Sequence, residues 1–384
     1  MKPSLQNRPL EGILVLEFAQ FLSGPLCGLR LADLGATVVK IERPGTGDTG
    51  RSLYLAKPST SENNVLFQAI NRNKQSFAAD LKSDQDRATL MKLIAKADVI
   101  IQNFRPGVME RLGFGYEALK AVNERLVYAS ISGFGEDGPW VKLPGQDLLA
   151  QARSGLMYLN GFKDSPPMPV GVSIADILAG LNLTQGILAA LVGRGRTGKG
   201  AKVDTSLLES LLDFQFELLT HYFNEGENPP VRGRSNIANA FLGAPYGVYR
   251  TKDSYMAIAM AKLSLLADLL NVPKLAAYDD PDRCFDERDT VVQILAAALE
   301  KETTDHWLSI LQPADVWCAE IMDWPTLLET EGVKRLEMFQ ELAGVGLRTT
   351  RPAIRIDDAL LSSERPAPEV GEHTQSIMDA YGLA

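Results

Sequence analysis

Residues 13–18, ILVLEF, form the run that decides the fold. The run is short and almost continuously apolar, which is typical of a strand buried on both faces. A helix is expected to open at Gly24-Pro25 and to continue to Leu34, and Thr37–Glu42 (TVVKIE) is a second β-rich run. Strand, helix and strand in this order predict two parallel strands joined by a helical crossover.

The same pattern occurs again further along the chain. A helix is expected over Asp84–Ala97, followed by the apolar run Val99–Phe104 (VIIQNF). A further helical segment precedes Leu126–Ser132 (LVYASIS). Repeated units with buried strands predict a parallel sheet covered on both faces, and right-handed crossovers would make it a doubly wound, Rossmann-like α/β layer.

The remainder of the chain divides by composition. Met168–Phe223 is dominated by helix, and Asn224–Ser235 (NEGENPPVRGRS) is the best candidate linker. A second α+β unit is expected over about Ala240–Ala319. The tail, Pro352–Ala384, is rich in proline and charge, so we expect it to pack back on the first domain.

Bulk composition limits the classes of function. The chain has 384 residues, 45% hydrophobic and 23% charged, which indicates a globular protein of two domains. Its formal net charge of -9 argues against nucleic acid as the main partner, because phosphate backbones need a basic surface. An anionic ligand would need a local basic site.

No membrane or export signal is expected. Residues 1–12 lack the apolar core of a secretory signal, and the apolar segment 174–192 carries Asp176, Asn182 and Gln185. The protein should therefore be cytosolic.

Cysteine and histidine usage predicts neither disulfides nor a metal site. The cysteines are three and far apart, which fits reduced core thiols: Cys27, Cys284 and Cys318. The three histidines lack ligand-like neighbours: His221, His306 and His373.

Residues 133–138 match the G-x-G-x-x-G pattern of dinucleotide sites. Pro139 follows, and residues 142–145 are typical of a loop, so no helix N-terminus is expected there to hold a pyrophosphate. We interpret the motif as a tight turn and expect no nicotinamide cofactor.

Asp176 is alone in the apolar and small-residue stretch Met168–Val192, without a cation near it in sequence. A buried, unpaired carboxylate is costly, so its presence suggests a nucleophile or general base. The alternative is an N-cap at the start of a helix whose apolar stripe includes Ile177 and Leu181. The two roles are compatible, because a helix N-terminus favours the ionised carboxylate.

Basic residues gather near the ends of the predicted strands, where doubly wound sheets bind ligands. Such a cluster would suit a phosphate-bearing cofactor, although solvated surface charge is the simpler explanation for each residue taken singly. The residues are Lys40, Arg43, Lys74, Lys82, Arg105 and Arg111.

Taken together, several segments resemble the class III CoA-transferase family, which is related to α-methylacyl-CoA racemases. The matching segments are PLEGILVLEFAQFLSGPLCG (9–28), LADLGATVVKIERPGTGD (31–48), NRNKQSFAADLK (71–82), ADVIIQNFRPGVMERLGF (97–114), SISGFGEDGP (130–139), GQDLLAQARSGLM (145–157), the Asp176 segment and RTGKGAKVDTSLLES (196–210). Such matches in order over most of the chain are more specific than any one of them.

The resemblance implies a fold and an assembly. A Rossmann-like large domain would be built from residues 1–223 and 331–384, with a smaller α+β domain, 224–330, inserted between them. Two chains would interlock as a homodimer.

The resemblance also implies a chemistry. Asp176 aligns with the aspartate that attacks the acyl-CoA thioester in family members, and coenzyme A is the only cofactor expected. The positions carried over for CoA binding are Leu22, Ser23, Arg43, Lys74, Lys82, Asn103, Phe104 and Arg111. Gly243 and Ala244 are candidate oxyanion donors, by analogy with a glycine-containing loop in relatives.

Specificity is less constrained. The chain lacks the run of four glycines of formyl-CoA transferases, which puts formate or oxalate in doubt as substrate. We expect succinyl-CoA as donor and a short carboxylic or dicarboxylic acid as acceptor.

Three alternatives remain open. The first is an α-methylacyl-CoA racemase. The related racemases have a histidine where this chain has Gln146 and a glutamate near the position of Lys262, and glutamine cannot take a proton. The neighbouring Asp147 is a candidate for orienting the site loop, or a turn or cap residue. A CoA-binding protein without turnover and an NAD-dependent enzyme are the other two alternatives.

Overall fold

The structure is a computed structural model that describes residues 8–53 and 64–383. Its contacts divide the chain into two compact units. The first unit takes the described residues of Met1–Arg153, Val172–Phe214 and Arg335–Ala384, and the second takes Ser154–Gly171 and Gln215–Lys334.

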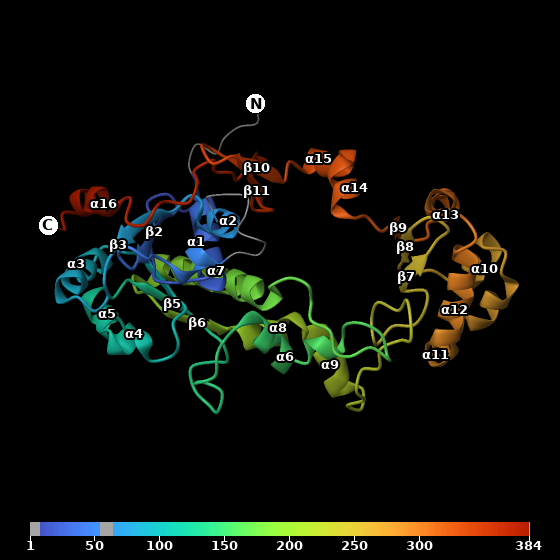
Figure 1. Cartoon of the computed structure of the whole chain (residues 1–384). Helices are drawn as coiled ribbons and strands as arrows, with labels where there is room; N and C mark the ends of the chain where they lie inside the picture. Colours follow the sequence, from blue (N-terminus) through green and yellow to red (C-terminus); the bar gives the residue numbers. More distant parts are fainter. Residues whose placement is uncertain (1–7, 54–63, 384) are drawn as a thin grey trace. The chain divides into compact units, whose positions relative to one another are not determined.

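Six parallel strands form the sheet of the first unit, in the order β3-β2-β1-β4-β5-β6. Figure 1 labels β2, β3, β5 and β6 of this sheet. This is the strand order of a Rossmann-type doubly wound sheet. The strands are β1 (Leu14–Glu17), β2 (Thr37–Glu42), β3 (Gln75–Ala78), β4 (Val99–Gln102), β5 (Val127–Ser132) and β6 (Lys202–Ser206). The predicted parallel α/β layer is confirmed.

Helices complete this unit. They are α1 (Ser23–Asp33), α2 (Val65–Asn71), α3 (Asp84–Ile94), α4 (Val108–Arg111), α5 (Tyr116–Val122), α6 (Asp147–Arg153), α7 (Ile174–Thr197), α8 (Leu207–Phe214) and α16 (Thr374–Tyr381). Two hairpins lie in the last segment of this unit, Arg335–Ala384: β10 (Phe339–Leu342) with β11 (Leu347–Thr350), and β12 (Arg355–Ile356) with β13 (Ala359–Leu360). The helix α15 (Glu331–Leu336) crosses the boundary between the units.

Alternation along β1 assigns the two faces of the sheet. Leu14, Leu16 and Phe18 share one core with residues of α3, α5 and α16. Glu17 points to the opposite face, where a Cβ built on Gly28 of α1 would meet its carboxylate. The C-terminal tail therefore contributes α16 to the core of the N-terminal sheet, through Ile377.

Helix α1 begins and ends where its sequence predicts. Pro25 lies in the first turn, which tolerates a residue without an N–H. The helix ends at Asp33, and Gly35 takes a positive φ of 107° that reverses the chain toward β2.

The length and composition of α7 correct the expectation that its polar residues rule out a membrane-spanning segment. By length and composition alone, Ile174–Thr197 could cross a membrane, although its polar residues had suggested otherwise. Its face of Ala175, Ala179, Leu183 and Ile187, spaced at four residues, is buried within the first unit, as in a core helix.

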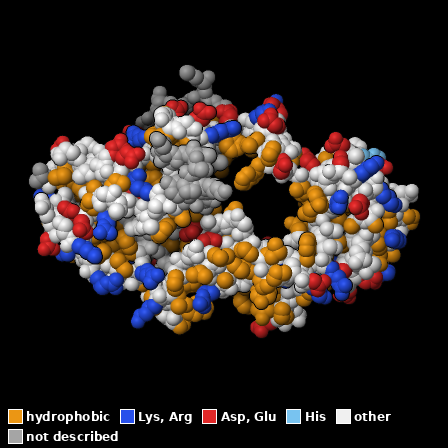
Figure 2. Space-filling model, viewed as in Figure 1, with side chains coloured by type: hydrophobic (Ala, Val, Ile, Leu, Met, Phe, Trp, Pro, Cys, Tyr) orange, Lys and Arg blue, Asp and Glu red, His pale blue; other side chains and the backbone are white. Residues whose placement is uncertain are grey.

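An apolar surface remains exposed beside this helix. Figure 2 shows hydrophobic side chains gathered over α6 and α8. The large exposed apolar residues on α6, α7 and α8 are Leu148, Leu149, Leu181, Val192, Leu212 and Phe214.

The second unit has an antiparallel sheet of β7 (Gly247–Arg250), β8 (Tyr255–Ile258) and β9 (Cys318–Glu320), in that order. Its helices are α9 (Phe216–Asn224), α10 (Leu263–Leu269), α11 (Pro281–Asp286), α12 (Arg288–Leu299), α13 (Thr304–Leu311) and α14 (Trp324–Glu329). A separate core packs Tyr249 and Met256 of the sheet against Leu266, Leu295 and Leu311 of the helices. This unit has the α+β composition expected of the smaller region.

The division of the chain differs in detail from the limits proposed on sequence. Contacts change unit after residues 214 and 334, whereas the sequence placed the limits at 223 and 330. Residues 154–171 also group with the second unit. The domain limits stay a prediction. The absence of an export signal also stays a prediction, because residues 1–7 lie outside the described residues.

The cysteines are free thiols, as expected. Cys27 and Cys284 are buried, whereas Cys318 on β9 is half-buried. Burial raises the pKa of Cys27 to about 12, so this thiol stays protonated. Among the described residues, no group of three or more His, Cys, Asp or Glu side chains could hold a metal ion.

Truncating Ile377 to alanine tests the placement of the tail. Because this side chain lies in the core shared with the sheet, Ile377→Ala should lower the free energy of unfolding by about 2 to 5 kcal/mol. Gln375→Ala, on the exposed side of the same helix, should change it by less than about 0.5 kcal/mol. Equal effects of the two variants in chemical denaturation would contradict the packing of α16.

Candidate active site

Asp176 lies in the first turn of α7 and is not its N-cap. The cap is Ser173, whose side chain makes no capping hydrogen bond. Instead, Asp147 Oδ1 accepts hydrogen bonds from the backbone N–H groups of Ala175 (2.7 Å) and Asp176 (3.3 Å). The N-cap interpretation of Asp176 was therefore wrong, because a carboxylate from α6 satisfies the free N–H groups of this helix end.

Asp147 is itself held in place. Its Oδ2 accepts a hydrogen bond of 2.7 Å from Gln151 Nε2, one turn along α6. Both oxygens of the carboxylate thus have partners, and α6 and α7 are joined at the point where Asp176 emerges. The cap role for Asp147, which the sequence left open, is the one that the structure shows.

The environment raises the pKa of Asp176 to about 6. Burial is the largest cause, the negative charge of Asp147 adds to it, and a hydrogen bond from Ser23 opposes both. The sequence predicted that the helix N-terminus would favour the charged form, but Asp147 occupies its N–H groups. At pH 7 the carboxylate remains mostly ionised, with the greater basicity that makes a carboxylate a better nucleophile.

Ser23 is the first residue of α1, directly after the turn that follows β1. A Cβ built on Gly180, one turn after Asp176 on α7, would lie 2.7 Å from the carbonyl oxygen of Ser23. Glycine at this position therefore lets the first turns of α1 and α7 approach closely. Gly180 was not among the predicted site residues, although its spacing of four residues from Asp176 places both on one face of the helix.

Three other predicted residues lie at the same edge of the sheet. Leu22 is the residue before α1, and its carbonyl oxygen accepts a 2.7 Å hydrogen bond from Leu26. Asn103 and Phe104 follow β4, the parallel neighbour of β1. Asn103 pairs through its amide with both backbone groups of Gln20, at 2.8 Å each. The structure thus brings these residues together with Ser23.

The predicted basic residues separate into two groups. The first group is exposed and follows β2, β3 or β4, toward the carboxyl edge: Arg43, Lys82, Arg105 and Arg111. Lys40 and Lys74 are fully buried and bind Glu17. The assignment of Lys74 to CoA contact is corrected, because it precedes β3 and its ammonium is enclosed beneath α1.

The glycine motif forms a loop. Gly133 and Gly145 pack backbone against backbone, since a Cβ built on either would meet the other within 2.6 Å. No helix begins between residues 133 and 146, which agrees with the interpretation as a turn. Gln146 is exposed beside Asp147 at the end of this loop.

Gly243 and Ala244 belong to the second unit. Ala244 is buried before a cis peptide bond to Pro245, and its carbonyl oxygen accepts a hydrogen bond from the Cys284 thiol. Their part as oxyanion donors stays a prediction.

Comparison with known families gives one match over most of the chain. A family model described as CoA-transferase family III matches residues 10–374. An acetyl-CoA:oxalate CoA-transferase of Acetobacter aceti is 37% identical over 329 residues, covering 84% of this chain and 82% of that protein. A succinyl-CoA:glutarate CoA-transferase of Mus musculus is 31% identical over 380 residues, covering 97% of this chain and 86% of that protein.

A solved structure agrees with this match. The crystal structure of a CAIB/BAIF family protein from Brucella suis superposes with a TM-score of 0.84 at 32% identity. The superposition covers 98% of this chain and 100% of the Brucella suis chain.

Replacing Asp176 with asparagine should stabilise the protein at alkaline pH. Because the folded pKa of about 6 lies above the ordinary 3.8, the folded state binds more protons, and stability falls as pH rises through this window. Asp176→Asn removes that cost, so its unfolding free energy should exceed the wild-type value by up to about 3 kcal/mol at pH 8. Exposed Asp137→Asn is the control, and an Asp176→Asn gain that does not shrink toward pH 4 would contradict the assignment.

Neutralising Asp147 should lower the pKa of Asp176. Asp147→Asn keeps an oxygen for the N–H of Ala175 but removes the like charge that raises this pKa. The carboxyl titration of Asp176, followed by NMR of ¹³C-labelled aspartate, should then move below about 6. Asp147→Ala should in addition cost about 1 kcal/mol of stability through the lost cap, and an upward shift in Asp147→Asn would refute the electrostatic role.

Proposed function

Because the chain belongs to CoA-transferase family III, we propose that it moves CoA from an acyl-CoA donor to a free carboxylic acid, with Asp176 as the nucleophile. The observation that carries this proposal is the half-buried carboxylate of Asp176, beside Ser23 and Asp147, with a pKa of about 6. Such a group is ionised at neutral pH and basic enough to attack a thioester.

The reaction proceeds in four displacements. The Asp176 carboxylate attacks the carbonyl carbon of the donor, the C–S bond breaks, and CoA thiolate leaves behind a mixed anhydride. The thiolate then attacks the Asp176 carbonyl, releasing the donor acid and forming an aspartyl-CoA thioester. The acceptor carboxylate displaces the thiolate to form a second anhydride. Attack of the thiolate on the acceptor carbonyl gives the new acyl-CoA and restores Asp176.

CoA is proposed to bind along the carboxyl edge of the sheet. Arg43, Lys82 and Arg111 are exposed cations near this edge and suit the phosphate groups. Asn103 and Phe104 would flank the pantetheine arm. Ser23 meets the nucleophile itself. Gly243 and Ala244 are retained as proposed oxyanion donors.

A dicarboxylic acid is the proposed acceptor, with succinyl-CoA as the donor. The two transferases compared above are named for oxalate and glutarate, which are both dicarboxylic acids. One of them uses acetyl-CoA and the other succinyl-CoA. Oxalate therefore belongs among the acceptors to be tried, despite the absence of the four-glycine run.

A homodimer in the cytosol is the proposed form of the enzyme. The exposed apolar side chains of α6, α7 and α8 favour cover by a second copy. The interlocked arrangement comes from the family resemblance and is part of this proposal.

The racemase alternative requires a second proton-transfer group. Gln146 stands beside Asp147 where the related racemases have their histidine, and its amide cannot take a proton. Incubation of the protein with a 2-methylacyl-CoA in D₂O tests this alternative. Deuterium at the α-carbon without acyl transfer would favour the racemase.

Mass spectrometry of the intact protein tests the transferase directly. After incubation with succinyl-CoA or acetyl-CoA and rapid acid quench, the wild-type chain should carry a CoA or acyl adduct on Asp176. Asp176→Ala should carry none, and Asp137→Ala, which changes an exposed aspartate, should react like wild type. Since ionised Asp176 is the attacking form, the rate of adduct formation should rise with pH through about 6.

A matrix of the two donors against oxalate, succinate, glutarate and mesaconate then identifies the acceptor. Wild-type protein that is folded but acquires no adduct from any acyl-CoA would refute the proposed function and favour a CoA-binding protein without turnover.

A further inference from the structure

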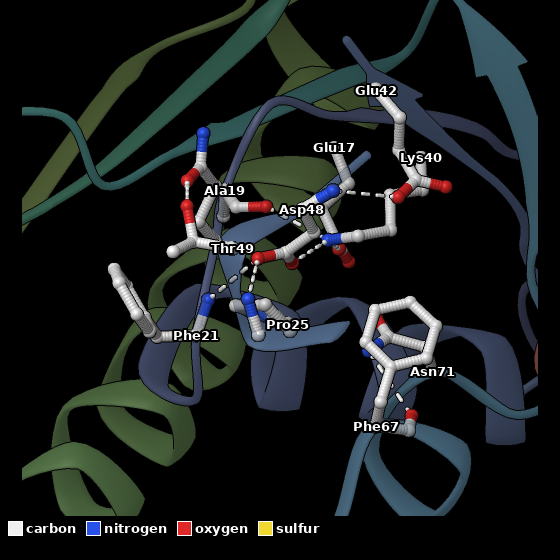
Figure 3. A network of polar contacts seen from close by, with 12 residues as sticks. Glu17, Ala19, Phe21, Pro25, Lys40, Glu42, Asp48, Thr49, Phe67 and Asn71 are labelled. Atoms are coloured by element: carbon white, nitrogen blue, oxygen red, sulfur yellow. Dashed lines mark hydrogen bonds and ion pairs between the residues drawn. The ribbon is translucent and has the colours of Figure 1, made fainter. Parts of the chain in front are cut away.

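Four charged side chains are buried together beneath the turn between β1 and α1. They are Glu17, Lys40, Asp48 and Lys74, whose side chains are at most 1% exposed. Figure 3 shows Lys40 between the carboxylates of Glu17 and Asp48. Two positive and two negative charges make the set neutral, yet burying each of them is costly. The proposed chemistry does not use any of the four directly.

Lys40 donates two hydrogen bonds and forms a second ion pair. Its Nζ donates to Glu17 Oε1 at 2.9 Å and to the carbonyl oxygen of Ala19 at 2.9 Å. The ion pair joins Nζ to Asp48 Oδ2 at 2.7 Å. Ala19 lies just after β1, so this lysine fixes the backbone where the turn begins.

Lys74 donates three hydrogen bonds. Its Nζ bonds Glu17 Oε2 (2.7 Å), Asn71 Oδ1 (3.0 Å) and the carbonyl oxygen of Pro25 (2.8 Å). Pro25 lies in the first turn of α1. The two oxygens of Glu17 therefore serve one lysine each, and the two lysines hold the backbone on both sides of Ser23.

Asp48 fixes the middle of the turn. Its Oδ1 accepts hydrogen bonds from the backbone N–H groups of Phe21 (3.3 Å) and Gly50 (2.7 Å). Phe21 has a positive φ of 65°, a conformation that non-glycine residues seldom adopt without support. Residues 19 to 25 are thus held at their start, their middle and their end.

We propose that the Glu17–Lys40–Asp48–Lys74 network is a positioning device that holds the Ser23 hydroxyl against the Asp176 carboxylate. The network holds the backbone on both sides of Ser23, and the close approach of Gly180 to the carbonyl oxygen of Ser23 brings this residue against α7, one turn from Asp176. The Ser23 hydroxyl in turn lowers the pKa of Asp176. This inference rests on the proposed function only for its catalytic consequence, since the effect on Asp176 itself can be measured without substrate.

Gly28 of α1 shows that the position of Glu17 in the network is specific. A Cβ on Gly28 would lie 1.9 Å from Glu17 Oε2, so the helix leaves room for this carboxylate only at a glycine. Gly28→Ala therefore displaces Glu17 without removing a charge from the network. Alanine is otherwise favoured over glycine in a helix, by about 1 kcal/mol, so the variant is expected to fold.

Stability alone is the rival explanation, and the other end of α1 supplies a matched control. Arg72 and Asp33 form an ion pair that is buried to the same degree, with a 2.9 Å contact from Nη2. It lies at the last residue of α1, away from the turn. Asp33→Asn breaks a buried ion pair without touching residues 19 to 25.

The test compares the carboxyl pKa of Asp176 in the full chain by NMR of ¹³C-labelled aspartate. The variants are Ser23→Ala, Gly28→Ala, Lys74→Met, the double variant Ser23→Ala/Gly28→Ala and the control Asp33→Asn. Losing the hydrogen bond to the ionised form should raise the pKa of Asp176 by about one unit, a tenfold change in proton affinity. Gly28→Ala and Lys74→Met should match Ser23→Ala, and the double variant should add nothing further.

The rate of adduct formation at pH 8 gives a second readout. A carboxylate that has lost this hydrogen bond is no longer held in one orientation, and this loss outweighs its greater basicity. The rate should therefore fall about tenfold in Ser23→Ala and Gly28→Ala, when expressed per folded molecule, and stay at the wild-type value in Asp33→Asn.

Several results would overturn the inference. One is an unchanged pKa of Asp176 in folded Gly28→Ala, and another is a shift in the double variant equal to the sum of the single shifts. A shift in Asp33→Asn as large as that in Gly28→Ala would show that stability alone is responsible. If the pKa shifts occur but wild-type protein forms no adduct with any acyl-CoA, the proposed function fails and the positioning role stands.

Discussion

The structure depends on how one helix end is capped. The free N–H groups at the start of α7 bond Asp147, a carboxylate from a different helix, so they do not neutralise Asp176. Asp176 is left half-buried, next to a second negative charge, with the hydroxyl of Ser23 to stabilise its ionised form. Burial and repulsion together outweigh the favourable field of the helix end. A basic, ionised carboxylate results, and covalent acylation would relieve the repulsion because it removes the charge.

The hydroxyl of Ser23 needs a fixed backbone, and side chains from the sheet fix it. Lysines from β2 and from the start of β3 reach the backbone of the β1–α1 turn, and Glu17 of β1 binds both. Their pKa values differ for a physical reason. Burial lowers the pKa of Lys74 to about 8, whereas Lys40 has two carboxylate partners, which outweigh burial and raise its pKa.

Much of the fold could be predicted because its signals are local. The apolar runs at 13–18 and 99–104 and the glycine at residue 35 each specify their own element, and the parallel order follows from their alternation with helices. Contacts between residues that are distant in sequence could be predicted less well. Asp176 was identified as a nucleophile, but Asp147 is 29 residues away and its cap could not be inferred from spacing. Lys74 was assigned to a ligand because a lysine near a strand suggests one, and only the packing of α1 shows its ammonium to be enclosed.

The central claim, that Asp176 forms a covalent bond with the transferred acyl group, is tested most directly by oxygen transfer. Succinyl-CoA and an acceptor acid whose carboxylate is labelled with ¹⁸O are turned over, and the peptide that contains Asp176 is then weighed by mass spectrometry. In the proposed sequence an oxygen of the acceptor bridges the second anhydride and remains on Asp176 when the thiolate takes the acyl group. The account predicts ¹⁸O in the side chain of Asp176 after turnover. Turnover that leaves Asp176 unlabelled would contradict it.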